Sequence, residues 1–193
     1  RKVEEQEEEA ELKFKHRFDE LFANALTLDD DDKKLEAEFL DPLCKALDVD
    51  ANTNRGAIKT RMEGWAEPMD GMDGLLRGYR KAGYRIYVLS DVTKFQWKKW
   101  KEKCGVALKW IDEPYFLSFE MGSLKTCECT FRKTLNSLGL EPGDVIFTDD
   151  NEQRLQLART VGLRTLLFRD SDQCRADLSA IYSVHPQPSK GTD

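Results

Sequence analysis

The feature that most constrains the fold of this chain is a strand-like run that ends in two adjacent carboxylates. Residues 145–151 are Val-Ile-Phe-Thr-Asp-Asp-Asn, and a helical pattern follows directly and ends at Gly162. Such a run predicts a buried parallel strand that carries Asp149 and Asp150 to the carboxyl edge of a sheet. Two neighbouring carboxylates repel each other and favour a cation or a shared proton between them. Mg²⁺ is a divalent ion that suits oxygen ligands of this kind.

Strand-like and helix-like patterns alternate over the rest of the chain from residue 67. The apolar runs that we expect to be strands cover residues 85–89, 115–119, 145–150 and 164–168. The helical patterns before and between them end at Gly83, near Cys104-Gly105, at Gly139 and at Gly162. This alternation predicts an α/β fold with a doubly wound, mostly parallel sheet, in a core domain of residues 67–170.

The chain before residue 67 is expected to be helical and to carry most of the negative charge. Apolar spacing predicts helices over residues 3–27 and 53–64, with a further helical region between them that restarts at Asp41-Pro42. Residues 1–32 contain twelve acidic and five basic residues. We therefore expect residues 1–66 to form a cap-like or docking segment whose acidic N-terminal helix contacts a protein partner.

Three classes of protein are disfavoured by composition. A net charge of −6 disfavours a nucleic-acid binder, which normally presents a basic face. No apolar run approaches the ~20 residues that span a bilayer, and no secretory signal pattern opens the chain.

Residues 171–193 are polar and contain prolines, so we expect them to be a loosely held tail.

The cysteines predict a reducing compartment, either the cytoplasm or an organelle matrix. Their number is odd, at five, and their spacing is irregular. Cys127-Glu-Cys129 offers too few ligands for a structural zinc site, because such sites need a full set of four. Free cysteines near a helix start are therefore the favoured interpretation of this pair.

Polar residues follow three of the predicted strands in an order that suits a phosphate site. Ser90 ends the first strand, Lys125 comes shortly after the second, and Asp149 and Asp150 end the third. A serine hydroxyl can donate to a phosphoryl oxygen, and a lysine can neutralise phosphate charge. Carboxylates can hold a metal ion that bridges phosphate to protein. Each residue alone could equally be a helix cap or an exposed charge.

These motifs resemble the haloacid dehalogenase-like (HAD) hydrolase superfamily, in its helical-cap phosphatase-like branch, over about residues 67–168. Val88-Leu-Ser-Asp91 is similar to the second family motif, Ser118-Phe-Glu-Met-Gly122 with Lys125 to the third, and Val145 to Asp150 to the fourth. The resemblance implies a Mg²⁺-dependent phosphatase fold. It implies that Ser90 and Lys125 bind phosphate and that Asp149 and Asp150 bind the metal.

The chain departs from the family pattern at its most important position. We find no Asp-x-Asp-Gly-Thr segment, which in this family supplies the aspartyl nucleophile and the general acid. The nearest candidate is the acidic run 29–32, which lacks the glycine and fits a solvated helix cap better. Asp91, Thr126 and Arg154 also replace residues common in the family, and Arg154 puts a permanent cation near the metal position.

The helix predicted around Trp97 and Trp100 is rich in lysine. Core packing beneath a lysine-coated face is favoured there over a nucleic-acid stacking site, because stacking sites need a wider positive surface. A protein-docking patch is the intermediate possibility.

Three functions remain compatible with this sequence. The missing nucleophile favours a non-catalytic phosphatase-like protein that acts as a scaffold or as a subunit of a larger assembly. The first alternative is a Mg²⁺-dependent phosphatase of phosphorylated small molecules whose nucleophile strand lies upstream of residue 1. The second is a module that binds phosphate or metal without catalysis.

Overall fold

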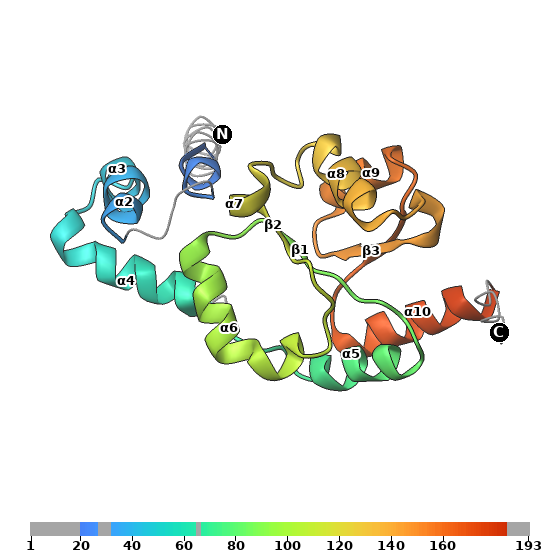
Figure 1. Ribbon diagram of the computed structural model, residues 1–193. Coiled ribbons are helices and arrows are strands. Elements are labelled where there is room, and N and C mark those ends of the chain that lie inside the picture. The colour runs from blue at the N-terminus through green and yellow to red at the C-terminus, as the bar shows by residue number, and fades with distance from the viewer. Residues whose placement is uncertain (1–19, 27–31, 65–66, 185–193) are drawn as a thin grey trace, which may run out of the picture. The chain divides into compact units, whose positions relative to one another are not determined.

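The computed structural model describes residues 20–26, 32–64 and 67–184, and the chain forms two compact units (Figure 1). The first unit comprises Arg1–Glu67, Val88–Leu108 and Pro114–Leu124. The second comprises Pro68–Tyr87, Lys109–Glu113 and Lys125–Asp193. The chain therefore passes between the units several times, whereas the predicted domain limits at residues 66 and 170 would divide it into consecutive segments.

The N-terminal part of the first unit is helical, as the apolar spacing predicts. Residues 20–25 are helical, and they are followed by α2 (Asp32–Leu35), a π-helical turn η1 (Glu36–Leu40), α3 (Asp41–Ala46) and α4 (Ala51–Gly64). Pro42 lies in the first turn of α3. The helix runs on through this proline, and the predicted restart at Asp41-Pro42 is a change from π-helical to α-helical hydrogen bonding. The other residues of the predicted helix 3–27, and Asp29 to Asp31, lie outside the described part of the chain.

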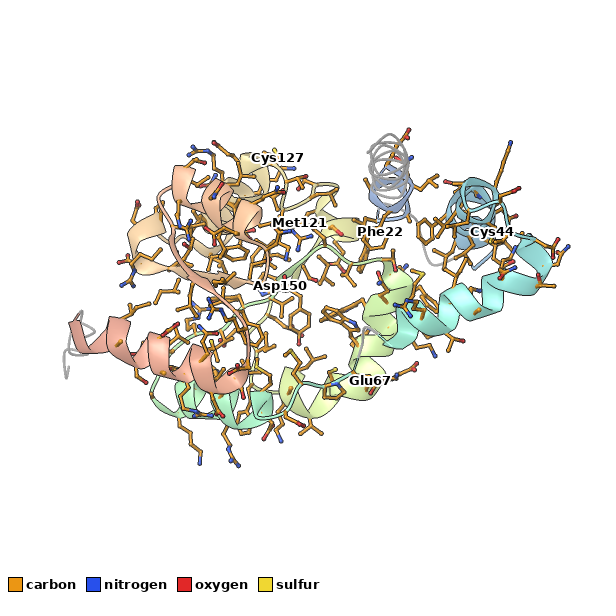
Figure 2. All side chains as sticks on the ribbon, turned by 180° about the vertical axis from the view of Figure 1, so that it is seen from behind. Phe22, Cys44, Glu67, Met121, Cys127 and Asp150 are labelled. Carbon is orange, nitrogen blue, oxygen red and sulfur yellow. A yellow bond between two sulfur atoms is a disulfide. The ribbon has the colours of Figure 1, made fainter. Side chains whose placement is uncertain are left out.

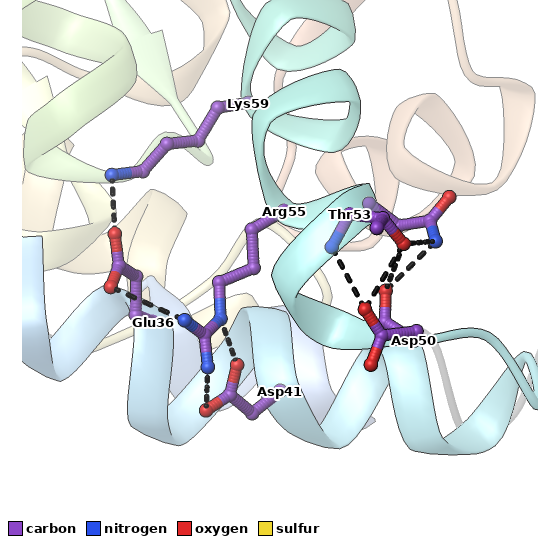
Figure 3. A network of polar contacts seen from close by, with 7 residues as sticks. Glu36, Asp41, Asp50, Thr53, Arg55 and Lys59 are labelled. Carbon is purple, nitrogen blue, oxygen red and sulfur yellow. Dashed lines mark hydrogen bonds and ion pairs between the residues drawn. The ribbon is translucent and has the colours of Figure 1, made fainter.

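An apolar cluster and an ion-pair network hold these helices together. The cluster consists of Leu21, Ala25, Leu35, Phe39, Leu40, Leu43 and Met62. In the ion-pair network, Arg55 of α4 donates to the Asp41 carboxylate through both Nε and Nη2 (Figure 3). The distance from Nη2 to Asp41 Oδ2 is 2.8 Å. Lys59 Nζ donates to Glu36 Oε1 at 3.1 Å. Both contacts tie α4 to the helices that precede it.

The first unit also contains one parallel strand pair. Strand β1 (Leu89–Ser90) pairs with β2 (Phe116–Leu117), and they are flanked by α6 (Lys94–Leu108) and α7 (Ser118–Met121). Helix α6 continues through Gly105, so its predicted end near Cys104-Gly105 is wrong. A Cβ added at Gly105 would meet nothing within 4 Å, so no close contact at this position ends the helix.

Both strands of this pair are shorter than the sequence predicts. In the second unit, the backbone N–H of Ile86 donates to Asp112 Oδ2 at 2.8 Å instead of to a strand. In the first unit, the Ser118 hydroxyl accepts from Val92 N–H at 2.9 Å and donates to Val92 O at 3.0 Å. The side chains of Asp112 and Ser118 thus bond backbone groups that would otherwise pair between longer strands, and the strands end early.

Trp97 is a core residue, as the packing interpretation of α6 predicts. Its side chain is buried in a cluster with Val92 and Leu117 and makes an edge-on contact with Tyr115 at 5.1 Å between ring centroids. Trp100 is half-buried on the same helix, and Lys98 and Lys101 are exposed. Among the described residues, no helix is long and apolar enough to cross a membrane.

The second unit is built around the strand that the sequence singles out. Strand β3 (Ile146–Asp149) pairs in parallel with β4 (Arg164–Leu167), and α9 (Glu152–Thr160) connects them. Helix α8 (Glu128–Leu138) lies beside α9, as Figure 1 shows, and the short 3₁₀ turn η2 (Pro142–Asp144) precedes β3. All four strands in the described residues pair in parallel, which confirms the α/β class.

Residues 171–184 form a packed helix, so the expectation of a loosely held tail is wrong for them. Helix α10 (Ser171–Val184) contacts α5 (Met72–Lys81) and β4. Cys174 is buried with Leu75 and Leu166, and further apolar side chains of α10 pack against this cluster. The apolar face of α10 is therefore packed against the rest of the unit, and this packing stabilises the helix although most of its residues are polar.

The start of α5 is fitted closely to the start of α10. Gly71 caps α5 with φ of 78°, a left-handed conformation that suits glycine. A Cβ at this position would collide with the hydroxyl of the buried Ser171 and lie 3.1 Å from its Cβ. Gly71 therefore has both a conformational and a steric reason to be glycine.

We expect Gly71→Ala to lower the free energy of unfolding by about 1–3 kcal/mol, because it adds backbone strain and a clash. Gly78→Ala is the matched control, since it lies within α5 with nothing within 4 Å of an added Cβ. The control should leave stability unchanged or raise it by up to about 1 kcal/mol. Urea unfolding followed by circular dichroism measures both, and equal effects of the two variants would contradict the close fit.

Candidate functional site

The candidate site lies at the carboxyl end of β3, in the second unit. Asp149 is the last residue of the strand and is only 7% exposed, whereas Asp150 is exposed. Asn151 caps α9, because its side-chain oxygen accepts from the N–H groups of Gln153 and Arg154. The interpretation of the two aspartates as caps of α9 is therefore wrong.

Lys125 is the principal partner of Asp149. Its Nζ lies 2.6 Å from Asp149 Oδ2, and both side chains are buried, at 10% and 3% exposure. The ammonium group also lies 5.9 Å from the centroid of the Phe147 ring, within cation–π range. Lys125 is thus not an ordinary exposed lysine, and the structure brings it together with Asp149 across 24 residues of sequence.

A second cation lies on the other oxygen of the same carboxylate. Arg154, from the first turn of α9, places Nη1 3.5 Å from Asp149 Oδ1. The backbone N–H of Asn151 donates to the same oxygen at 2.9 Å. Both oxygens of Asp149 are therefore engaged by positively charged or hydrogen-bonding groups of the chain itself.

These contacts keep Asp149 ionised. Burial of the carboxyl group opposes ionisation, but the charge and hydrogen bond of Lys125 outweigh it. The backbone N–H of Asn151 and the charge of Arg154 act in the same direction, and the pKa of Asp149 is held below its ordinary value. An aspartate in this state can accept hydrogen bonds or bind a cation, but it cannot donate a proton near neutral pH.

The described residues do not by themselves fit a Mg²⁺ site. A divalent ion would need the oxygens of Asp149 that Lys125 and Arg154 now contact, and like charges at that distance repel. Within residues 20–26, 32–64 and 67–184, no three His, Cys, Asp or Glu side chains gather as a possible metal site. Asp150, labelled in Figure 2, adds one exposed carboxylate next to Asp149 in sequence.

Ser90 lies in the first unit, half-buried at the end of β1. Its participation in a common phosphate site with Lys125 and Asp149 stays a prediction. Of the acidic run considered as a nucleophile, only Asp32 is described, and it begins α2.

The interpretation of Cys127 and Cys129 as free cysteines is wrong, because a disulfide joins them. The two residues flank Glu128 at the start of α8, where their side chains can meet across one residue. Cys44, Cys104 and Cys174 do not take part in a disulfide.

Comparison with known proteins gives a limited match in sequence. No model of a protein family matches the chain. The drimenol cyclase DrtB of Aspergillus calidoustus is 29% identical over 99 residues, which are 51% of this chain and 18% of the cyclase. The chain therefore spans less than a fifth of the length of this curated relative.

Comparison with solved structures identifies the fold. A HAD-family enzyme from Bacteroides thetaiotaomicron is 25% identical with a TM-score of 0.57, over 82% of this chain and 78% of the enzyme. A structure of the same enzyme in complex with magnesium and inorganic phosphate is 25% identical with a TM-score of 0.51, over 69% of each chain. The HAD-like fold predicted from the motif order is confirmed.

The lowered pKa of Asp149 predicts a dependence of stability on pH. The carboxylate stabilises the fold above its unfolded pKa of about 3.9, and this contribution is lost as the pH falls through the lower folded pKa. Asp149→Asn should flatten the fall in unfolding free energy between about pH 5 and pH 2. At pH 7 it should cost about 3 kcal/mol, because it removes the negative charge that the buried Lys125 faces at 2.6 Å.

The exposed neighbour supplies the control for this measurement. Asp150→Asn should change the unfolding free energy at pH 7 by less than about 0.5 kcal/mol. Urea unfolding at a series of pH values measures both variants. If Asp149→Asn were as mild as Asp150→Asn at pH 7, the buried pair would not be stabilising.

Proposed function

We propose that this chain, whose fold is HAD-like, is a phosphatase-fold protein without hydrolytic activity as it stands, acting as a scaffold or as a subunit of a larger assembly. The observation that supports the proposal is that both carboxylate oxygens of Asp149 are already in contact with groups of the same chain. Its two oxygens are held by Lys125, Arg154 and the N–H of Asn151, so the carboxylate that would serve a metal is neutralised internally.

Chemical requirements support this proposal. Phosphoryl transfer through an aspartyl-phosphate needs a carboxylate with a free oxygen and a second group that can give up a proton. Asp149 has its oxygens engaged and its pKa lowered, so it suits neither role. Lys125 directs its ammonium group to Asp149, where its charge is already balanced.

The partners of such a subunit would be proteins. The acidic segment 1–32 offers one contact surface by its charge. Helix α6 offers another, because half-buried Trp100 lies among exposed lysines and Val106 of the same helix is 64% exposed. Trp97 is buried and therefore supports this surface from beneath. Binding of nucleic acid is not part of the proposal.

We expect the purified full chain with Mg²⁺ to hydrolyse neither p-nitrophenyl phosphate nor common phosphorylated metabolites above the buffer rate. The physical reason is the internal neutralisation of Asp149. Release of inorganic phosphate measures the activity, and Asp149→Asn serves as the background control. Turnover that is present in the wild type and lost in this variant would contradict the proposal.

A Mg²⁺-dependent phosphatase is the second candidate, because the structural neighbour was crystallised with magnesium and inorganic phosphate. In this case Ser90 and Lys125 would bind the phosphate, and Asp149 and Asp150 the metal, while the nucleophile strand would lie upstream of residue 1. Arg154 would then have to leave Asp149. N-terminal sequencing and the intact mass of the native protein distinguish this candidate from the first.

We expect Arg154→Asn to raise the affinity of the site for Mg²⁺ by about tenfold or more, because it removes a cation from Asp149 Oδ1. Isothermal titration calorimetry with Mg²⁺, with and without inorganic phosphate, measures the change. Arg159→Asn is the matched control, since Arg159 lies on the same helix but pairs with Glu152 at 2.6 Å.

The titration also tests the third candidate, a non-catalytic binding module. Binding of inorganic phosphate or Mg²⁺ to the wild type without turnover would favour that module. Equal affinities of wild type and Arg154→Asn for Mg²⁺ would show that Arg154 does not compete with the metal.

A further inference from the structure

The disulfide between Cys127 and Cys129 is a chemically reactive feature that the proposed function does not use. Both cysteines are exposed at the start of α8, where Figure 2 labels Cys127. The three cysteines outside the disulfide are less accessible, because Cys44 and Cys174 are buried and Cys104 is half-buried. Small thiols and disulfides in solution can therefore reach the 127–129 pair most readily.

The local geometry distinguishes the two sulfur atoms. Cys127 is the N-cap of α8, with an extended backbone, and its Sγ accepts from the N–H of Cys129 at 3.1 Å. A sulfur held by a backbone N–H at the positive end of a helix is favoured as the thiolate. Cys129 lies inside the first turn, so this cap bond favours Cys127 as the more nucleophilic thiol.

The carboxylate between the two cysteines is directed elsewhere. Glu128 accepts from the Thr160 hydroxyl at 2.7 Å and from Arg132 Nη2 at 3.3 Å. These two contacts outweigh the desolvation of the carboxyl group and lower the pKa of Glu128. Arg132 partly balances the negative charge of Glu128. The electrostatic repulsion between Glu128 and a thiolate at Cys127 is therefore weakened.

We propose that Cys127 and Cys129 form a reversible thiol–disulfide centre, in which Cys127 is the attacking thiol and Cys129 the resolving thiol. The oxidant is a low-molecular-weight disulfide such as glutathione disulfide. The inference is independent of the phosphatase-like function, because it rests on residues outside the Lys125–Asp149 pair.

The exchange proceeds in two balanced steps. The Cys127 thiolate attacks one sulfur of glutathione disulfide, which forms a mixed disulfide and releases one glutathione thiolate that takes up the displaced proton. The Cys129 thiolate then attacks the Cys127 sulfur, which forms the protein disulfide and releases the second glutathione. Two cysteine thiols are oxidised by two electrons in total, and one glutathione disulfide is reduced to two glutathione molecules.

The test uses the full chain, reduced with dithiothreitol, freed of reductant and then exposed to glutathione disulfide under native conditions. Acid quenching, alkylation after denaturation and intact mass spectrometry count the remaining thiols. We expect the wild type to lose two of its five thiols without keeping glutathione. Peptide mapping should place the loss at Cys127 and Cys129, and Cys104 is the internal control because burial raises its pKa.

Two single variants assign the roles. Cys129→Ser should keep one glutathione on Cys127, because the resolving thiol is gone. Cys127→Ser should gain glutathione at Cys129 about tenfold more slowly, because Cys129 lacks the cap hydrogen bond. Thermal unfolding followed by circular dichroism checks that both variants fold. The proposal is overturned if the wild type keeps five thiols, or if the two variants gain glutathione at equal rates.

Discussion

The ion pair between Lys125 and Asp149 is the interaction on which the candidate site depends. Buried charges are costly to remove from water, and the 2.6 Å contact between the two side chains offsets part of that cost for each. The pair fixes the end of β3 to the segment that precedes α8, although 24 residues separate the two positions. Arg154 then adds a second cation to a carboxylate that already has one.

The sequence was most informative where a pattern has a single structural solution. The run before Asp149 forms the predicted parallel strand, although Ile146 and Phe147 are only half-buried and Thr148 is exposed. The order of Lys125 and Asp149 along the chain placed both near one sheet edge. The sequence could not show which residue caps α9. Asn151 is the cap, but Asp149, Asp150 and Asn151 are adjacent and have similar preferences for the cap position. The position of Arg154 was noticed from the sequence, but its contact with Asp149 required coordinates.

Other differences came from contacts between distant residues. The strand predicted over 85–89 is short because the side chain of Asp112 satisfies the backbone of Ile86, and such a pairing leaves no local signal. The C-terminal helix was missed for a different reason. Cys174, Leu178 and Ile181 recur at helical spacing and all pack in one cluster, but the polar residues between them dominated the composition. The Cys127–Cys129 bond was missed because an odd number of cysteines suggested free thiols.

The contact between α5 and α10 has a consequence for the order in which the second unit is assembled. Leu75 and Cys174 belong to one buried cluster, yet they lie at opposite ends of the sequence that forms this unit. Closing such a long loop is slow, and the contact cannot form during synthesis until α10 has left the ribosome. Until then the apolar faces of α5 and β4 remain uncovered. During that interval these faces are the part of the unit most exposed to association with other chains.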